Sequence, residues 1–198
     1  RDVTVLSDSH DHDHDHEDHA IDPHLWLHVG NIRTIAQDLS AALVMRAPEH
    51  RSLFQSNLAA FLDQLDQIEA DIKSRFQPSD PLRYMAAHDS FQYFDVKYGF
   101  QLAAVVTGSD GHEVGPKTVA KFIADLSKTP VSCLILDPRE GAALAQQIAT
   151  DLAIPVIELD PTGDAMDTTR NDILGLLRET AAAFDTCFDV NTAAAQSQ

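Results

Sequence analysis

The chain has 198 residues, of which 44% are hydrophobic, and this is enough for one large domain or two small domains with a real core. Its net charge is -17 with the histidines neutral, and its 14 lysines and arginines are scattered, so we expect no nucleic-acid-binding surface. No run of about 18 apolar residues occurs, so we expect no membrane-spanning helix.

The first 20 residues change character abruptly. The apolar stretch DVTVL predicts a short strand, and the run HDHDHDHEDH follows it at residues 10–19. This run is too charged to pack against a core, so we expect a mobile loop. It is a solvated acidic linker, a device that gathers metal ions loosely, or a purification tag, although a common tag is an unbroken run of histidines and this run alternates with aspartate. Its histidines are His10, His12, His14, His16 and His19.

Two helices are predicted next. The first starts near Asn31, with one apolar stripe made of Ile32, Ile35, Leu39 and Leu43. The second covers residues 48–74 and begins at a proline, which the first turn of a helix tolerates. Its apolar residues alternate steps of four and three: Phe54, Leu58, Phe61, Leu65, Ile68 and Ile72. At 1.5 Å per residue it would be about 40 Å long, so it either braces two lobes or forms the core of one domain.

Beyond residue 78, predicted strands alternate with predicted helices. The strands cover residues 83–88, 101–106, 131–136 and 155–159. The helices cover residues 90–99, 117–126, 140–152 and about 168–188, with Asp89 or Ser90 capping the first of them. This alternation predicts an α/β fold, with a parallel sheet flanked by helices on both faces. Residues 189–198 look like a frayed tail.

The two cysteines lie far apart and form no C-x-x-C motif. Cys133 lies in VSCLILD, a predicted buried strand, and Cys187 lies on the apolar face of the last predicted helix. They are either two free core thiols of a cytosolic protein or one disulfide of an exported protein. Their spacing leaves both possibilities open.

Candidate metal ligands lie at well-defined places in this pattern. In proteins with an open parallel sheet, ligands bind beyond the carboxyl ends of the strands. His88 and Asp160 each end a predicted strand and so lie at this edge of the predicted sheet. His24 lies in DPHLWL, between a proline that stiffens the chain and a tryptophan that anchors it. Two imidazoles and one carboxylate suit a divalent ion and leave at least one coordination position open. His28 and His112 are further candidates.

Four features in one order carry a family resemblance: DPHLWL, the long helix, HDSFQYF and IPVIELDP, with the His/Asp run ahead of the first. Together they resemble the metal-specific periplasmic substrate-binding proteins of ABC transporters, most closely the zinc-uptake type, over nearly the whole chain. The resemblance implies two α/β lobes joined by one long rigid helix, with the metal between them. It also implies a periplasmic protein that delivers Zn2+ to a membrane permease and is not an enzyme.

The same resemblance implies roles for single residues. His24 and His88 would ligate Zn2+, with Asp160 as an acidic ligand or near neighbour. Cys133 and Cys187 match a disulfide of zinc-type members. The His/Asp run matches the His-rich loop of the family, and we expect it to gather zinc and pass it inward.

The resemblance also implies a division of the chain. Residues 1–30 would be the remnant of an N-terminal lobe with the His/Asp-rich loop, and residues 31–78 a helical segment containing the interlobe helix. Residues 79–190 would be the C-terminal metal-binding lobe, and 191–198 a disordered tail. An early histidine ligand ahead of the loop is absent. We therefore expect a fragment, or a member whose remaining ligand comes from the loop, a water or another copy of itself.

Rival functions remain open from the sequence. Imidazole suits zinc, whereas manganese prefers sites richer in carboxylate, so a manganese-type binding protein is the second choice. A zinc-dependent hydrolase needs a general base beside the metal, and no H-E-x-x-H motif is present. An adhesion lipoprotein with the same fold is a further alternative, and no cysteine precedes Cys133 to carry a lipid.

Overall fold

The structure is a computed structural model that describes residues 2–7, 21–76, 82–106, 123–126, 128–139, 143–164 and 172–195, with side chains as far as residue 188. It divides into two compact units, Arg1–Gln77 and Pro78–Gln198. Among the described residues, no helix is long and apolar enough to cross a membrane.

The first unit begins with an extended segment that is not a strand. Residues 2–6 belong to no sheet, so the strand predicted for DVTVL is wrong, and one antiparallel bridge joins Ser7 to Ile21. The buried side-chain amide of Asn31 accounts for the difference. Thr4 N donates to Asn31 Oδ1 at 2.7 Å, and Asn31 Nδ2 donates to Thr4 O at 2.9 Å. The amide thus gives Thr4 the pairing that a neighbouring strand would supply.

Helix α1 covers Val29–Arg46, which confirms the predicted helix but not its buried face. Of the predicted stripe only Ile32 is buried. The other buried residues of α1 lie outside the stripe and include Ser40 and Val44. The rest of the stripe is 40–58% exposed: Ile35, Leu39 and Leu43. The apolar face of α1 is therefore open to solvent over most of its length.

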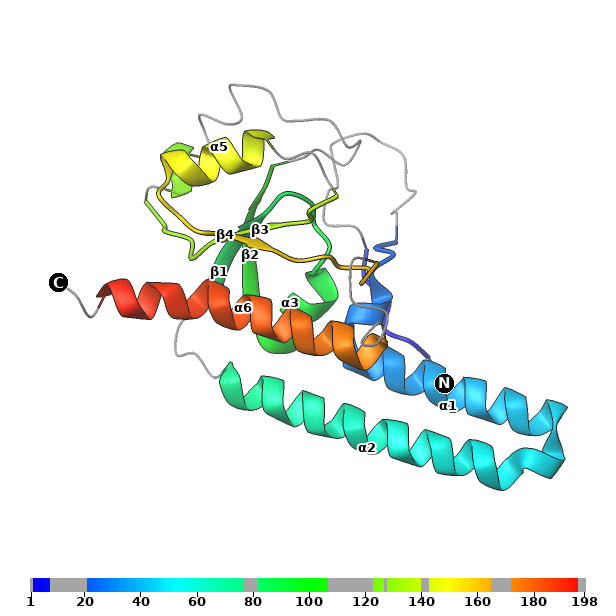
Figure 1. Ribbon diagram of the computed structural model, residues 1–198. Helices are drawn as coiled ribbons and strands as arrows, with labels where there is room; N and C mark the ends of the chain where they lie inside the picture. The colour runs from blue at the N-terminus through cyan, green and yellow to red at the C-terminus, as the bar shows by residue number, and fades with distance from the viewer. Residues whose placement is uncertain are drawn as a thin grey trace. The chain divides into compact units, whose positions relative to one another are not determined.

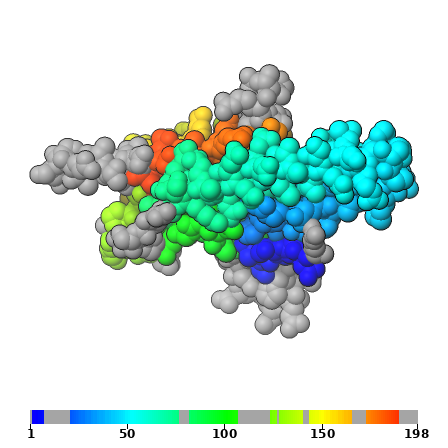
Figure 2. Space-filling model, turned by 90° about the horizontal axis from the view of Figure 1, so that it is seen from below, coloured from blue at the N-terminus to red at the C-terminus, as the bar shows by residue number. Residues whose placement is uncertain are grey.

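Helix α2 covers Arg51–Arg75, directly after a short 3-10 turn at Pro48–His50. Its stripe is as predicted, with three half-buried residues, Phe54, Leu58 and Phe61, followed by three buried ones, Leu65, Ile68 and Ile72. With 25 residues it is about 38 Å long. α1 and α2 lie side by side as an antiparallel pair (Figures 1 and 2). Arg33 of α1 joins the pair by contacting Asp66 and Glu69 of α2.

The second unit contains one parallel sheet of four described strands in the order β2-β1-β3-β4. The strands are β1 (Leu82–Ala86), β2 (Phe100–Val105), β3 (Leu134–Leu136) and β4 (Val156–Glu158). The helices with complete bounds are α3 (Gln92–Tyr98), α5 (Ala143–Asp151) and α6 (Ile173–Ala195). This confirms the predicted α/β fold with a parallel sheet.

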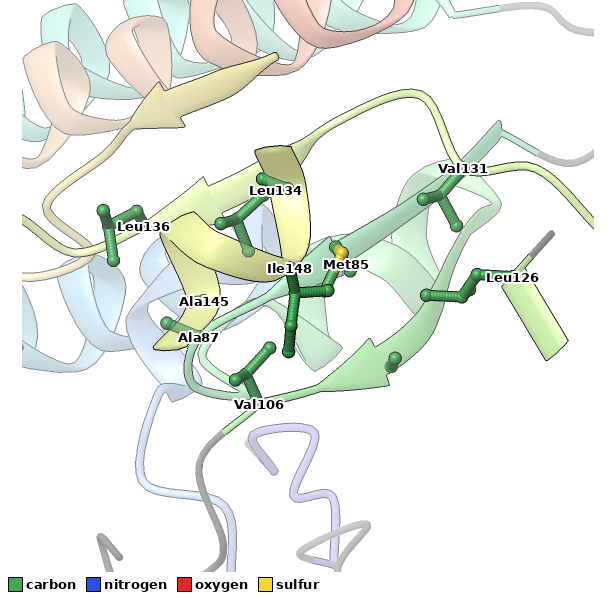
Figure 3. Packing of buried hydrophobic residues seen from close by; sticks show 11 residues of the cluster. Met85, Ala87, Val106, Leu126, Val131, Leu134, Leu136, Ala145 and Ile148 are labelled. Atoms are coloured by element: carbon green, nitrogen blue, oxygen red, sulfur yellow. The ribbon is translucent and has the colours of Figure 1, made fainter. Parts of the chain in front are cut away.

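Helices cover both faces of this sheet. Successive residues of a strand point to opposite faces, and in β1 Met85 faces α5 whereas Tyr84 packs against Phe184 of α6. Figure 1 shows α5 on one side of the sheet and α3 and α6 on the other. On the α5 face, Figure 3 shows the side chain of Ile148 close to those of Met85 and Val106. The other face carries a cluster of aromatic rings.

Several element ends differ from the predicted ones. β1 ends at Ala86, so His88 lies just beyond the strand rather than at its last residue. α3 begins at Gln92 after Phe91, without a side-chain cap, so the cap predicted at Asp89 or Ser90 is wrong. α6 continues to Ala195, past its predicted end and into the predicted tail. Of the helix predicted at 117–126, residues 123–126 are described and helical.

A disulfide joins Cys133, which immediately precedes β3, to Cys187 of α6. The two Cα atoms are 5.4 Å apart, and both side chains are fully buried. The pairing decides between the two alternatives that the cysteine spacing left open. It ties the last helix to the centre of the sheet.

Candidate metal site

His24 belongs to the first unit and is oriented by a carboxylate two residues before it. Its Nδ1 atom lies 2.7 Å from Oδ1 of the buried Asp22, and its backbone N–H donates to the same oxygen at 2.8 Å. A carboxylate accepts hydrogen bonds, so Nδ1 of His24 is the donor. The lone pair of the neutral ring is then on Nε2, which is the arrangement of histidines that bind metals with a carboxylate behind them.

Short-range structure fixes the backbone on which His24 sits. Leu27 N donates to His24 O at 3.0 Å and His28 N donates to Leu25 O at 3.3 Å, which forms a 3-10 turn at Leu25–Leu27. Leu27 is fully buried and anchors this turn. The ring of Trp26 packs edge-on against the His24 ring at a centroid distance of 5.4 Å. A histidine held in this way is preorganised to act as a ligand.

His28 has a different role from His24. Its Nδ1 atom accepts a hydrogen bond from Asn31 N at 3.2 Å and so caps the start of α1. The ring lies over the first turn so closely that a Cβ atom on Gly30 would be 2.8 Å from its Cε1 atom. The contact gives His28 a structural role and makes His24 the stronger candidate ligand of the two.

His88 belongs to the second unit and lies in the connection between β1 and α3. Ala87 N still donates to Ile135 O of β3 at 3.0 Å, so the sheet supports the chain up to the residue before His88. Ser90 N donates to His88 O at 3.0 Å, which tightens the turn that follows. His88 is half-buried there, beyond the carboxyl end of its strand.

A partly buried hydrogen bond joins the two elements on either side of the same connection. Tyr84 of β1 donates its hydroxyl to Oδ2 of Asp95 of α3 at 2.8 Å. Burial raises the pKa of Asp95 to about 8, with a further rise from Asp89, although the Tyr84 hydrogen bond opposes it. Burial also raises the pKa of Tyr84 well above its usual value. At neutral pH the pair is mostly uncharged and holds α3 against β1.

Asp160 lies beyond the carboxyl end of β4 and is buried. Its Oδ1 atom accepts from the backbone N–H of Thr162 at 2.9 Å and from the Thr162 hydroxyl at 2.8 Å. The same oxygen lies 2.8 Å from a guanidinium nitrogen of Arg139. The carboxylate is therefore held both by the turn that follows β4 and by a cation from the end of β3.

Arg139 binds two further carboxylates. Its Nε and one terminal nitrogen form a fork on Asp137, at 3.0 and 2.6 Å. Its other terminal nitrogen donates to Asp164 at 2.9 Å and to the Thr162 hydroxyl at 2.8 Å. The hydrogen bond with Asp137 and the three negative charges raise the pKa of Arg139 above its usual value, so it stays charged.

The structure places the predicted ligands in two different units. His88 and Asp160 follow β1 and β4 and so lie at the same edge of one parallel sheet, whereas His24 is in the first unit. Within the described part of either unit, no three His, Cys, Asp or Glu side chains gather closely enough to hold a metal ion. The histidines of the run at 10–19 and His112 lie outside the described residues.

Two residues of this site were missed from the sequence. Asp22 was visible in IDPH, where an aspartate precedes a proline and a histidine and so can fold back onto the ring. Arg139 follows β3 in the turn-forming stretch DPRE, but its partner Asp160 lies 21 positions later in the chain. Their contact depends on the pairing of β3 with β4, in which Leu136 lies opposite Glu158.

Comparisons with known proteins agree on one family. The family model described as ZnuA, zinc-uptake complex component A periplasmic, matches residues 1–187. The high-affinity zinc uptake system protein ZnuA of Brucella abortus (strain 2308) is 23% identical over 166 residues, which cover 84% of this chain and 50% of the relative. Its counterpart in Haemophilus influenzae is 25% identical over 164 residues, covering 83% and 49%. This chain thus spans about half the length of the curated relatives that it matches.

Solved structures show the same fold. A crystal structure of ZnuA superposes with a TM-score of 0.78 at 21% identity, covering 94% of this chain and 67% of that one. The binding protein FpvC from Pseudomonas aeruginosa, solved in complex with Mn2+, superposes with a TM-score of 0.68 at 18% identity, covering 89% and 66%. The likeness extends over most of the described chain.

Proposed function

The chain belongs to the family of zinc-uptake complex component A periplasmic proteins, and from this premise we propose that it binds Zn2+ as the cargo of an ABC transporter. Proteins of this family are substrate-binding components of transporters rather than enzymes. The bound ion would be captured in the periplasm and handed to a membrane permease. The chemistry required of the chain is therefore reversible coordination, with no bond broken in the cargo.

We assign the ligands to His24, His88 and Asp160. The observation that carries this assignment is the hydrogen bond of 2.7 Å between His24 Nδ1 and Asp22, which orients the ring and sets its tautomer. His88 and Asp160 fit because both follow the carboxyl ends of strands in one sheet. In this proposal residues 79–190 form the C-terminal lobe, α2 is the interlobe helix, and residues 1–30 belong to the N-terminal lobe.

Zinc is favoured over manganese by the donor set. Two imidazoles and one carboxylate suit zinc, whereas manganese selects sites richer in oxygen ligands. Manganese binding is the second candidate, since FpvC, which has the same fold, was solved with Mn2+. Competitive loading with equal amounts of both ions, followed by elemental analysis of the protein, should recover zinc. Recovery of mainly manganese would reverse the choice.

The His/Asp run at residues 10–19 is proposed to gather zinc and pass it inward. Five imidazoles spread over ten residues can bind a metal in many combinations, and each combination must order the chain, so the affinity of the run should be weak. An unperturbed imidazole takes up a proton near pH 6.5 and metal binding requires its neutral form, so capture should fade as the medium acidifies. Replacing the five histidines of the run should lower the stoichiometry measured by zinc calorimetry at pH 7.5. An unchanged stoichiometry would reject the gathering role.

Calorimetric titration of the 198-residue chain with zinc tests the main site. His24→Ala and His88→Ala should each weaken the tight binding event by at least about a hundredfold, since each removes an inner ligand. His28→Ala is the matched control, because it removes an imidazole four residues from His24 that caps α1. It should lower stability by about 1 kcal/mol and leave zinc affinity unchanged. Wild-type affinity in the His24 or His88 variant would overturn the assignment.

A further inference from the structure

We infer that Arg139 is a built-in competitor of the metal for Asp160, so that it weakens zinc capture and speeds zinc release. This inference rests on the proposed function, because it takes Asp160 as a zinc ligand. The observation behind it is that a guanidinium nitrogen of Arg139 lies 2.8 Å from Asp160 Oδ1. A cation at this oxygen opposes the approach of a second cation.

Asp160 does not depend on Arg139 for its position. The backbone N–H and the hydroxyl of Thr162 both donate to Asp160 Oδ1, at 2.9 and 2.8 Å. These two bonds belong to the turn that directly follows β4, so they orient the carboxylate locally. The effect of Arg139 on Asp160 is therefore mainly electrostatic, and removing the guanidinium should leave the carboxylate in place.

Arg139 can also release Asp160 and keep its ion pairs with Asp137 and Asp164. Its fork on Asp137 uses Nε and the same terminal nitrogen that faces Asp160, which carries two hydrogens, and its bond to Asp164 uses the other terminal nitrogen. Bidentate pairing with Asp137 is the strongest of these contacts. Arg139 thus stays anchored when a metal takes the Asp160 carboxylate, and it is ready to return when the metal leaves.

The charges of this cluster fit the exchange. Asp137, Asp160 and Asp164 surround a single guanidinium, so two negative charges are left over. A divalent ion at Asp160 would neutralise this excess. The Arg139 side chain is 40% exposed, so solvent and salt screen the competition, and its effect on affinity should be moderate rather than dominant.

Arg139→Gln tests the inference, since it removes the charge but keeps much of the length. At low ionic strength the variant should bind zinc about tenfold more tightly, with most of the change in the dissociation rate, and the gain should shrink at about 0.5 M salt. Asp164→Asn is the matched control, because it alters the cluster but leaves Arg139 on Asp160. It should change zinc affinity much less. Unchanged or weaker binding by Arg139→Gln would overturn the inference.

A second variant and a second measurement complete the test. With Asp160→Asn as background, Arg139→Gln should no longer tighten binding, because the shared carboxylate is gone. Crystals of the zinc-loaded wild-type chain should show Arg139 still paired with Asp137 but no longer bonded to Asp160. A retained Arg139–Asp160 bond in the loaded chain would reject the competition even if Arg139→Gln failed to fold.

The failure of this inference differs from the failure of the proposed function. If His88→Ala abolishes zinc binding and Arg139→Gln leaves it unchanged, the function stands and the competition is rejected. If the wild-type chain takes up no zinc, or if His24→Ala and His88→Ala bind it normally, both are rejected.

Discussion

The Nδ1 atom of His24 lies 2.7 Å from Oδ1 of Asp22, and the two side chains are only 12% and 5% exposed. Water competes little for a hydrogen bond in such a place, so the bond holds the imidazole in one orientation. The partner is also close in sequence, which allows the first unit to prepare His24 without help from residues far along the chain. The proposed ligand His24 is thus oriented before any metal arrives.

Asp22→Asn should therefore weaken zinc binding by about tenfold, because the loss of such a supporting carboxylate reduces the basicity of the ring and loosens its orientation. Asp63→Asn is a suitable control, since it changes the net charge equally at an exposed position of α2. Zinc calorimetry on both variants and the wild type at pH 7.5 measures the difference. Equal losses in both variants would mean that only net charge matters.

The partly buried Asp95 predicts an unusual pH dependence of stability. Its pKa is about 8 in the folded chain and about 3.8 when exposed, so between these values the folded state binds a proton that the unfolded state does not. The free energy of unfolding should then fall by a few kcal/mol as the pH rises from about 4 to about 8. The stabilising contribution is present at acid pH and lost through the folded pKa.

Asp95→Asn should flatten this profile, because the amide is neutral at every pH and its oxygen can still accept from Tyr84. Urea unfolding from pH 5 to pH 8.5, monitored by near-UV circular dichroism of tyrosine, is the appropriate measurement. All three tyrosines, Tyr84, Tyr93 and Tyr98, are in the second unit, so in a Trp26→Phe background, which removes the overlapping signal of the first unit, this dichroism reports on the second unit. A variant with the wild-type slope would assign the pH dependence to another group.

The parts of the fold that the sequence predicts well depend on local patterns. The stripe of α2 repeats over 25 residues, and each of its apolar residues is at least half-buried. The stripe of α1 is just as regular, yet Leu39 is 58% exposed. Periodicity identifies the apolar face of a helix, but the element that covers this face is a tertiary property. The same limit explains DVTVL, whose pairing partner is the side chain of Asn31 rather than a strand.

In the candidate site, too, local patterns predict some features and tertiary contacts decide the others. Asp160 could be predicted because it directly follows an apolar strand in an α/β pattern, and the rule that ligands bind beyond such strands needs no further information. Its contact with Arg139 could not, because the register of β3 against β4 brings them together. The spacing of Cys133 and Cys187 left their pairing open for a similar reason, since spacing does not tell whether two buried thiols meet; the disulfide was expected only from the family resemblance, and the structure confirms it.

Removing this disulfide should destabilise the second unit strongly. The bond closes a loop with a sequence separation of 54, and a loop of this size restricts the unfolded chain by about 4 kcal/mol in the entropy model. The double variant Cys133→Ala, Cys187→Ala should lose about this much in urea unfolding followed by tyrosine dichroism. A reducing agent should lower the stability of the wild type similarly and leave the double variant unaffected. A sensitivity of the double variant to reductant would point to another cause.

Phe184 of α6 is the centre of the aromatic cluster on the other face of the sheet and is fully buried. Its ring lies 4.8–5.8 Å, between centroids, from the rings of five others: Tyr84, Phe91, Phe94, Phe100 and Phe188. These rings come from β1, β2, α6, α3 and the residue before α3, so the cluster joins the connection that carries His88 to the last helix. Truncating Phe184 should therefore open a cavity that no single neighbour can fill.

Phe184→Ala should cost about 3–5 kcal/mol, whereas Phe184→Leu should cost much less because it keeps most of the volume. Val96→Ala on α3 is the control, since Val96 is 66% exposed and its truncation should cost less than about 0.5 kcal/mol. Tyrosine dichroism should show the loss in the second unit. The fluorescence of Trp26, the one tryptophan of the chain, reports on the first unit and should change less. Equal shifts of both signals would show that the two units unfold together and that the cluster stabilises the whole chain.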